Sequence, residues 1–165
     1  MPHLQPATPA DIDEIMRLER LDGNERLVGR FERAEHEAEF AAAGTRYLAW
    51  RGEGGALLGF AILQRFDNPH KNVNLRRIVV AEPGAGLGRA FLPALVDWFF
   101  EQTDHNRLDL NVYVHNERAW RAYLREGFVE EGVQRDIGIG WDGRFHDMKL
   151  MSMLRRDWLA LPRRR

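Results

Sequence analysis

The sequence predicts an α/β fold in which helices pack on a mixed sheet. Three observations support this prediction. Helical patterns come first, short strands separated by turns follow, and strands then alternate with helices. A chain of 165 residues can form one domain with a sizeable core. We therefore expect residues 1–165 to be a single domain, with a frayed tail over residues 155–165.

The first part of the chain is predicted to form two helices. Thr8 is a suitable N-cap, Pro9 fits the first helical position, and Asp11 follows the cap at the position of a capping-box acid. A second helix is expected over about residues 31–43 and ends at Gly44. The segment between the two helices is charged and has no regular pattern.

The middle of the chain is typical of an antiparallel meander. Residues 47–50 and 57–66 are apolar runs separated by a glycine-rich turn at 52–55, which is the pattern of a hairpin. A third strand is expected over residues 73–81, after a loop at 67–72.

A long helix is expected to follow at residue 87. Its apolar residues recur every three or four positions and predict one buried face, formed by Leu87, Ala90, Phe91, Ala94, Leu95, Trp98 and Phe99. Pro93 interrupts this pattern, and we expect a local bend there because proline removes a backbone hydrogen bond.

The last third of the chain combines strands with one helix. The strands are expected at residues 107–115, 128–133 and 145–154. The helix is predicted over residues 116–126, with Asn116 as its N-cap and Gly127 just past its end. Asp142 and Gly143 are expected to form a two-residue hairpin turn before the final strand.

Composition and charge exclude several classes of function. The net charge of −1 gives no general attraction to nucleic acids or anionic membranes, so we expect neither as a partner. The chain has no cysteine, which excludes disulfides, thiolate metal sites and a cysteine nucleophile. No histidine pair has a convincing metal spacing, so no metal is expected. No signal peptide or membrane span is evident, and we expect a cytoplasmic protein.

The strand, turn and helix around residues 76–89 say most about function. Three glycines in five residues leave backbone N–H groups uncovered, and the following helix adds its unpaired N–H groups and the positive end of its dipole. The pattern predicts a site for phosphate or pyrophosphate. It is not a P-loop, because no Lys-Ser or Lys-Thr follows the turn. A dinucleotide site remains an alternative, with Asp109 about 20 residues farther on.

Three segments, taken together, resemble the GCN5-related N-acetyltransferases, the GNAT superfamily. The first is the strand, turn and helix of residues 77–99. The second and third, residues 108–119 and 120–128, contain the spacing Asn-x-x-Ala-x-x-x-Tyr-x-x-x-Gly-Phe. The resemblance covers about residues 47–154. The ending at residues 148–154 looks like the branch of ribosomal-protein N-terminal and spermidine acetyltransferases.

The resemblance implies a central, mostly antiparallel twisted sheet with helices on both faces. It also implies acetyl-CoA as co-substrate and a primary amine as acceptor, either a small molecule or a protein N-terminus, and leaves a homodimer open. The residues that would hold the pyrophosphate are Gly84, Ala85, Gly86, Leu87, Gly88 and Arg89. Those that would offer backbone groups to the pantetheine arm are Ile78, Val79 and Val80. Asn116 would contact the CoA arm, and Tyr123 would protonate the departing thiolate.

The chemistry supports this role for Tyr123. Amide formation from a thioester needs a neutral amine, a donor for the oxyanion and a proton for the leaving thiolate. A phenol, with a pKa of about 10, keeps its proton at pH 7. Asn116, Ala119 and Tyr123 share one helix face over about 10 Å of axis. An isolated tyrosine is more often a core aromatic, but the surrounding motif favours catalysis.

Two features depart from the family pattern or stay open. Pro83 stands where the family usually has arginine or glutamine, and it has no N–H to give. The general base is not identified, and the candidates besides a water chain are Glu82, Asp109, His115 and His146. These features motivate a second hypothesis, a non-catalytic acyl-CoA-binding or regulatory module on the same fold. The segments expected to select the acceptor are residues 21–30, 67–72 and 136–147.

Overall fold

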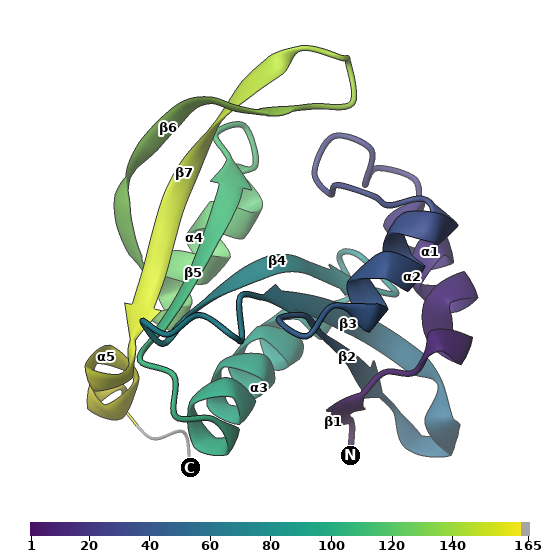
Figure 1. Cartoon of the computed structure of the whole chain (residues 1–165), viewed down its shortest axis with the longest axis horizontal. Helices are drawn as coiled ribbons and strands as arrows, with labels where there is room; N and C mark the ends of the chain where they lie inside the picture. The colour runs from purple at the N-terminus through teal and green to yellow at the C-terminus, as the bar shows by residue number, and fades with distance from the viewer. Residues whose placement is uncertain (163–165) are drawn as a thin grey trace.

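A seven-stranded sheet forms the centre of the computed structural model, which describes residues 1–162. The strands are β1 (His3–Pro6), β2 (Arg46–Arg51), β3 (Leu57–Gln64), β4 (Asn72–Val80), β5 (Arg107–Tyr113), β6 (Val129–Ile139) and β7 (Phe145–Leu154). Their order in the sheet is β1-β2-β3-β4-β5-β7-β6 (Figure 1). Neighbouring strands are antiparallel except for the parallel pair β4 and β5.

Helices cover both faces of this sheet, as the sequence predicts. They are α1 (Ile12–Glu19), α2 (Arg33–Ala41), α3 (Leu87–Gln102), α4 (Glu117–Glu126) and α5 (Arg155–Ala160). Helices α3 and α4 lie on one face, and α1 and α2 cover part of the other. Short 3₁₀ turns occur at Pro9–Asp11 and Glu53–Gly55. No helix within residues 1–162 is long and apolar enough to cross a membrane.

Strand β3 contributes side chains to two hydrophobic cores, one on each face of the sheet. Its side chains alternate between the two faces of the sheet. Ala61 and Leu63 pack in the core under α3, whereas Phe60 and Ile62 pack in the core under α1. A strand buried on both faces carries a continuous apolar run, which explains why residues 57–64 have no polar alternation.

Helix α3 is confirmed, and it continues through Pro93. Its buried face is only partly the predicted one. Phe91, Leu95 and Phe99 are buried as expected, but Ala90 is exposed. Their adjacent residues Leu92, Val96 and Phe100 are buried as well.

The two termini of the described chain differ from the prediction. Strand β1 was not predicted, because four residues ending at a proline carry too little alternation to be recognised. The expected frayed tail is wrong for residues 155–160, which form α5. The guanidinium of Arg155 donates to the carbonyls of Phe100, Thr103 and His105, so this arginine holds the segment in place. Residues 163–165, with the expected frayed Arg-Arg-Arg end, lie outside the described residues.

The hairpin of β6 and β7 is longer than expected. Strand β6 extends to Ile139, and its register shifts between Gln134 and Gly138, which interrupts the apolar alternation. The expected two-residue turn is wrong, because the N–H of Gly140 donates to the carbonyl of Arg144 and three residues lie between them. Gly143 supplies the positive φ, 71°, that this turn requires.

Candidate active site

The parallel strands β4 and β5 pair over only three residues. Asn72, Val73 and Asn74 lie opposite Arg107, Leu108 and Asp109. Beyond this point β4 pairs only with β3, and β5 pairs only with β7. The facing backbone edges of residues 75–80 and 110–113 therefore have no strand partner, and the sheet opens here (Figure 1). An extended ligand can use such edges as an additional strand would.

A β-bulge lies beside this opening. Ile62 is opposite Arg77 and Leu63 is opposite Leu75, so Arg76 is an extra residue in β4. The bulge turns the side chain of Arg76 to solvent, whereas that of Arg77 is buried. Bulges leave one residue unpaired in the ladder and re-aim side chains next to functional sites.

The glycine turn follows the C-terminal end of β4 and leads into α3. Gly84 and Gly86 have φ values of 95° and 85°, which glycine adopts without strain. A Cβ added at Gly84, Gly86 or Gly88 would meet no atom within 4 Å, so the turn is open to a ligand. The N–H groups of Gly86, Leu87 and Gly88 have no acceptor within residues 1–162. The predicted pyrophosphate residues thus lie together at a helix N-terminus, and all except the half-buried Leu87 are exposed.

Helix α4 carries the two residues of the second predicted motif. The side-chain oxygen of Asn116 accepts a hydrogen bond of 3.2 Å from the N–H of Ala119, so Asn116 is the N-cap. The ring of Tyr123 packs edge to face on Phe128, with centroids 5.6 Å apart. Its hydroxyl has no hydrogen bond within residues 1–162. Burial raises the pKa of Tyr123 to about 12, so the phenol keeps its proton at neutral pH.

These predicted residues lie on one side of the sheet. Ile78, Val80, Leu87 and Tyr123 all pack against the core beneath α3 and α4. The start of α3, the free edge of β4 and the ring of Tyr123 therefore contact the same core. Val79 faces the other core, beneath α1, so it can contribute only its backbone at the opening.

The candidate general bases differ in the hydrogen bonds and ion pairs that they make. Asp109 is held by the guanidinium groups of Arg65 and Arg107, at 2.6 and 3.3 Å, and by the amide of Asn74 at 2.8 Å. His146 bonds Asp142 at 2.8 Å, and His115 bonds the carbonyl of Arg26 at 2.7 Å. Glu82 is exposed at the start of the turn. The carboxylate oxygens of Asp109 are therefore already bound by donors of this chain.

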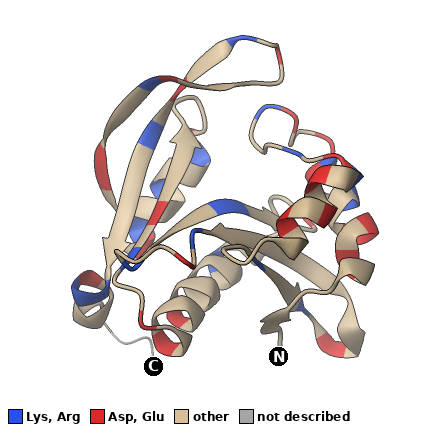
Figure 2. Ribbon diagram, viewed as in Figure 1, with Lys and Arg blue, Asp and Glu red and all other residues tan. Residues whose placement is uncertain are grey.

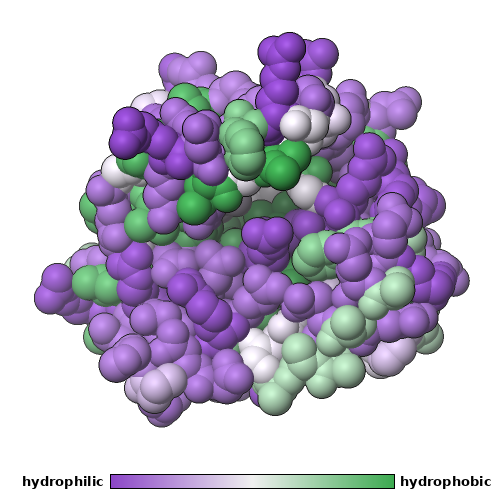
Figure 3. All heavy atoms as spheres, turned by 45° about the horizontal axis from the view of Figure 1, so that its top comes forward, coloured by the Kyte–Doolittle hydropathy of each residue, from purple (hydrophilic) through white to green (hydrophobic). Residues whose placement is uncertain are grey.

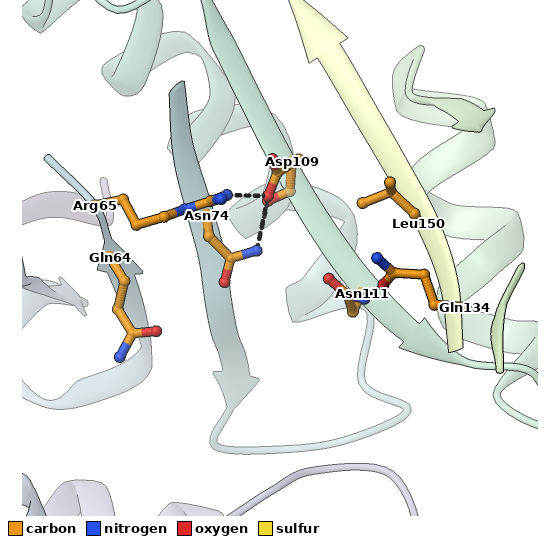
Figure 4. A pocket seen from close by; sticks show the side chains of 7 residues that line it. All are labelled: Gln64, Arg65, Asn74, Asp109, Asn111, Gln134 and Leu150. Atoms are coloured by element: carbon orange, nitrogen blue, oxygen red, sulfur yellow. Dashed lines mark hydrogen bonds and ion pairs between the residues drawn. The ribbon is translucent and has the colours of Figure 1, made fainter. Parts of the chain in front are cut away.

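A polar hollow of about 380 Å³ lies on the sheet face that α3 and α4 do not cover (Figure 4). Its lining residues are Gln64, Arg65, Asn74, Asp109, Asn111, Gln134 and Leu150. Asp109 and Asn111 alternate with the buried residues of β5 and therefore share this face. Sequence reasoning missed Gln64, Arg65, Asn74 and Gln134, because only the sheet pairing brings these segments together.

An aromatic group bounds this open face. It consists of Tyr113, His115, Trp141 and His146, with neighbouring ring centroids 4.7 to 6.2 Å apart. Arg26, from the segment between α1 and α2, places its guanidinium 5.9 Å from the centroid of the Trp141 ring. The segment between α1 and α2 thus reaches the hairpin of β6 and β7. Figure 3 shows the surface hollowed between walls of mixed hydrophobic and hydrophilic residues.

The comparisons with known proteins fit this geometry. The family model described as acetyltransferase (GNAT) family matches residues 12–128. The chain belongs to the GNAT acetyltransferase family. The predicted resemblance is therefore confirmed, and the match includes the glycine turn, Asn116 and Tyr123. Among the described residues, no group of three or more His, Asp or Glu side chains is arranged to hold a metal ion.

Two curated relatives of this GNAT protein match part of its length. A putative ribosomal N-acetyltransferase of Bacillus subtilis is 31% identical over 105 residues, which are 63% of this chain and 57% of that protein. A spermidine N(1)-acetyltransferase of Vibrio cholerae is 30% identical over 105 residues, 62% of this chain and 60% of that protein. The chain thus spans about three fifths of these relatives' length.

A solved structure matches nearly the whole GNAT chain. It is the spermidine N-acetyltransferase from Vibrio cholerae in complex with CoA and spermine. The TM-score is 0.80 at 22% identity, over 96% of this chain and 98% of the other. At this identity the likeness establishes the shared fold, and it confirms the predicted mixed sheet with helices on both faces.

Proposed function

We propose that this chain transfers the acetyl group of acetyl-CoA directly to a primary amine. The observation that carries the proposal is the opening between β4 and β5, which has the glycine turn at one end and Tyr123 on the same side. Family membership and the names of the relatives support an acyl transfer reaction. The acceptor class is a small-molecule amine or a protein N-terminus.

The donor would bind mainly through the backbone. The N–H groups at Gly86–Gly88 and the start of α3 suit a pyrophosphate, with Arg89 beside them. The free edge of β4 at residues 78–80 suits the amide groups of a pantetheine arm. Asn116, whose side-chain oxygen caps α4, keeps its amide N–H groups for the CoA arm. Pro83 gives no N–H, so the site relies on the glycines.

The transfer would form a C–N bond as the C–S bond breaks. The attacking amine loses one proton to water, and Tyr123 gives one proton to the leaving thiolate and recovers it from solvent. Because burial raises the pKa of Tyr123, the phenol stays protonated until this step. The N–H groups along the unpaired edge of β4 are the candidate donors to the oxyanion.

Replacement of Tyr123 by phenylalanine tests the proposal. We expect Tyr123→Phe to lower kcat by about 10²-fold or more, because the thiolate loses its proton donor. CoA affinity, measured by calorimetry, should stay within about twofold. Tyr47→Phe is the matched control, because it removes a hydroxyl that bonds His36 away from the opening. Its turnover per folded molecule should be unchanged, and unchanged turnover of Tyr123→Phe would remove Tyr123 from the mechanism.

A non-catalytic acyl-CoA-binding module is the second candidate. Pro83 at the turn and the ion-paired state of Asp109 favour it, because proline gives the turn no N–H and Asp109 is already bound by two arginines. Thermal stabilisation by acetyl-CoA without acetylation of any amine in a broad panel would support this alternative. CoA release that depends on an added amine would exclude it.

A further inference from the structure

Arg76 is an unpaired cation at the edge of the open face. As the extra residue of the bulge, it lies two residues beyond Asn74, where β4 and β5 separate. Its side chain is exposed, and it has no ion pair or hydrogen bond within residues 1–162. Its guanidinium carbon lies 6.0 Å from the centroid of the Phe31 ring. The next residue, Arg77, is instead buried and paired with Glu19.

The guanidinium of Arg76 lies on the open face, beside the segment between α1 and α2 that is expected to select the acceptor. Burial raises the pKa of Tyr113, and Arg76 is the strongest of the charges that oppose this rise. Tyr113 shares a face of β5 with Asp109 and Asn111, the face of the polar hollow. Figure 2 shows the basic residues of β4 at the centre of this face, whereas acidic residues gather on α1 and α2.

Arg26, in the segment between α1 and α2, places a second guanidinium beside the open face. It lies over Trp141, and its side chain has no ion pair within the described part of the chain. A guanidinium supported by an aromatic ring keeps its N–H edge free for a carboxylate. The open face thus presents two guanidinium groups, those of Arg76 and Arg26, that have no ion pair within residues 1–162.

Several carboxylates around this face are already paired within the chain. Asp109 pairs with two arginines, and Asp142 pairs with His146. Glu32 pairs with Arg20, whereas Asp136 and Asp147 have no ion pair within residues 1–162 and lie on the hairpin of β6 and β7. Beside Arg76, at the point where β4 and β5 separate, an anion would find a free guanidinium.

We propose that Arg76 binds a carboxylate of the acceptor, so that the substrate is an amine that also carries a carboxylate. This inference rests on the proposed acetyl transfer. Arginine binds a carboxylate through two parallel hydrogen bonds, which fixes the orientation of the bound molecule as well as its position. The amine of such a substrate is then presented at the point where the strands separate. A polyamine offers no group for Arg76.

Matched pairs of acceptors test this inference. Each pair is a free amino acid and its carboxamide, which share the amine and the side chain, and spermidine serves as the polycation. We expect kcat/KM to be about tenfold or more higher for the free acids. Arg76→Ala should remove the difference mainly through KM, and Arg76→Glu should reverse it. Arg156→Glu, the same charge reversal on exposed α5, should keep the preference.

The outcomes separate this inference from the proposed function. Equal or better acetylation of the carboxamides or of spermidine would overturn the inference and leave acetyl transfer intact. If no amine is acetylated, the proposed function fails, and calorimetric binding of the same acid and amide pairs decides the inference. Equal affinity for acid and amide, or a preference that Arg76→Glu does not change, would then overturn it.

Discussion

Two glycines of the turn after β4 differ in what they tolerate. Gly86 has a φ of 85°, so any side chain there strains the backbone. Gly88 has no such requirement, and a Cβ added to it meets open space. A substitution at Gly88 therefore separates ligand binding from folding better than one at Gly86.

Gly88→Glu should block CoA binding and leave the fold intact. The carboxylate lies in the first turn of α3, where a negative charge favours the helix but repels a pyrophosphate. We expect CoA affinity to fall by about tenfold or more in calorimetry, with little change in thermal stability. Gly88→Ala, which adds no charge, is the control and should bind more tightly than Gly88→Glu. Normal CoA affinity of Gly88→Glu would place the phosphate site elsewhere.

The residues of the site differ in how far the sequence could identify them. The turn glycines and Tyr123 belong to local spacings, so the sequence alone singles them out. Arg76 gives no such signal, because the bulge exists only through the pairing of β4 with β3. Two partners of Asp109, Arg65 and Asn74, lie outside β5, so these contacts could not be read from its neighbours in sequence.

Helix α5 depends on tertiary contacts more than on its own sequence. Arg155 at its start reaches the last turn of α3 and the segment before β5, and donates to three carbonyls there. The final carbonyls of a helix have no partner within the helix, so a cation at this position satisfies them.

Arg155→Ala should lower the free energy of unfolding by about 1–3 kcal/mol, because it leaves partly buried carbonyls without donors. Urea denaturation followed by circular dichroism measures the change. Arg156→Ala, at the exposed neighbouring position, is the matched control and should have almost no effect. If the two variants were equally stable, Arg155 would have no part in anchoring α5.

The contrast between local sequence pattern and tertiary contact also explains which elements could be predicted. Helix α3 and strand β3 have long apolar patterns, so their existence follows from local sequence. Strand β1 and helix α5 are four and six residues long, and each is stabilised by contacts with distant segments. The end of β6 was missed because its register shift interrupts the alternation.

At the scale of the whole molecule, a buried polar network joins the N-terminal helices to the sheet. Glu19 of α1 binds Arg77 of β4 and His36 of α2, and His36 binds the hydroxyl of Tyr47 in β2. All four residues are buried. The network supports the segment between α1 and α2, which carries Arg26 and Phe31 along the open face.

Glu19→Gln should strongly destabilise the protein. It leaves the guanidinium of Arg77 buried without a counter-charge, which costs about 3–5 kcal/mol in comparable pairs. Glu14→Gln on the same helix removes only an exposed ion pair with Arg17, and should leave the thermal midpoint almost unchanged. Equal midpoints of the two variants in a thermal melt would show that the network contributes little.

The three residue pairs between β4 and β5 also hold the two halves of the sheet together. They join β1–β4 to β5–β7, whereas β5 and β7 share seven pairs. Among the described strand pairs this seam has the fewest paired residues, so local opening of the sheet should begin there. If the proposed function holds, acetyl-CoA lying along the free edge of β4 would contact both sides of the seam between β4 and β5. Binding of acetyl-CoA would then stabilise the contact between the two halves of the sheet. The free energy of binding and the free energy needed to separate the halves would be linked.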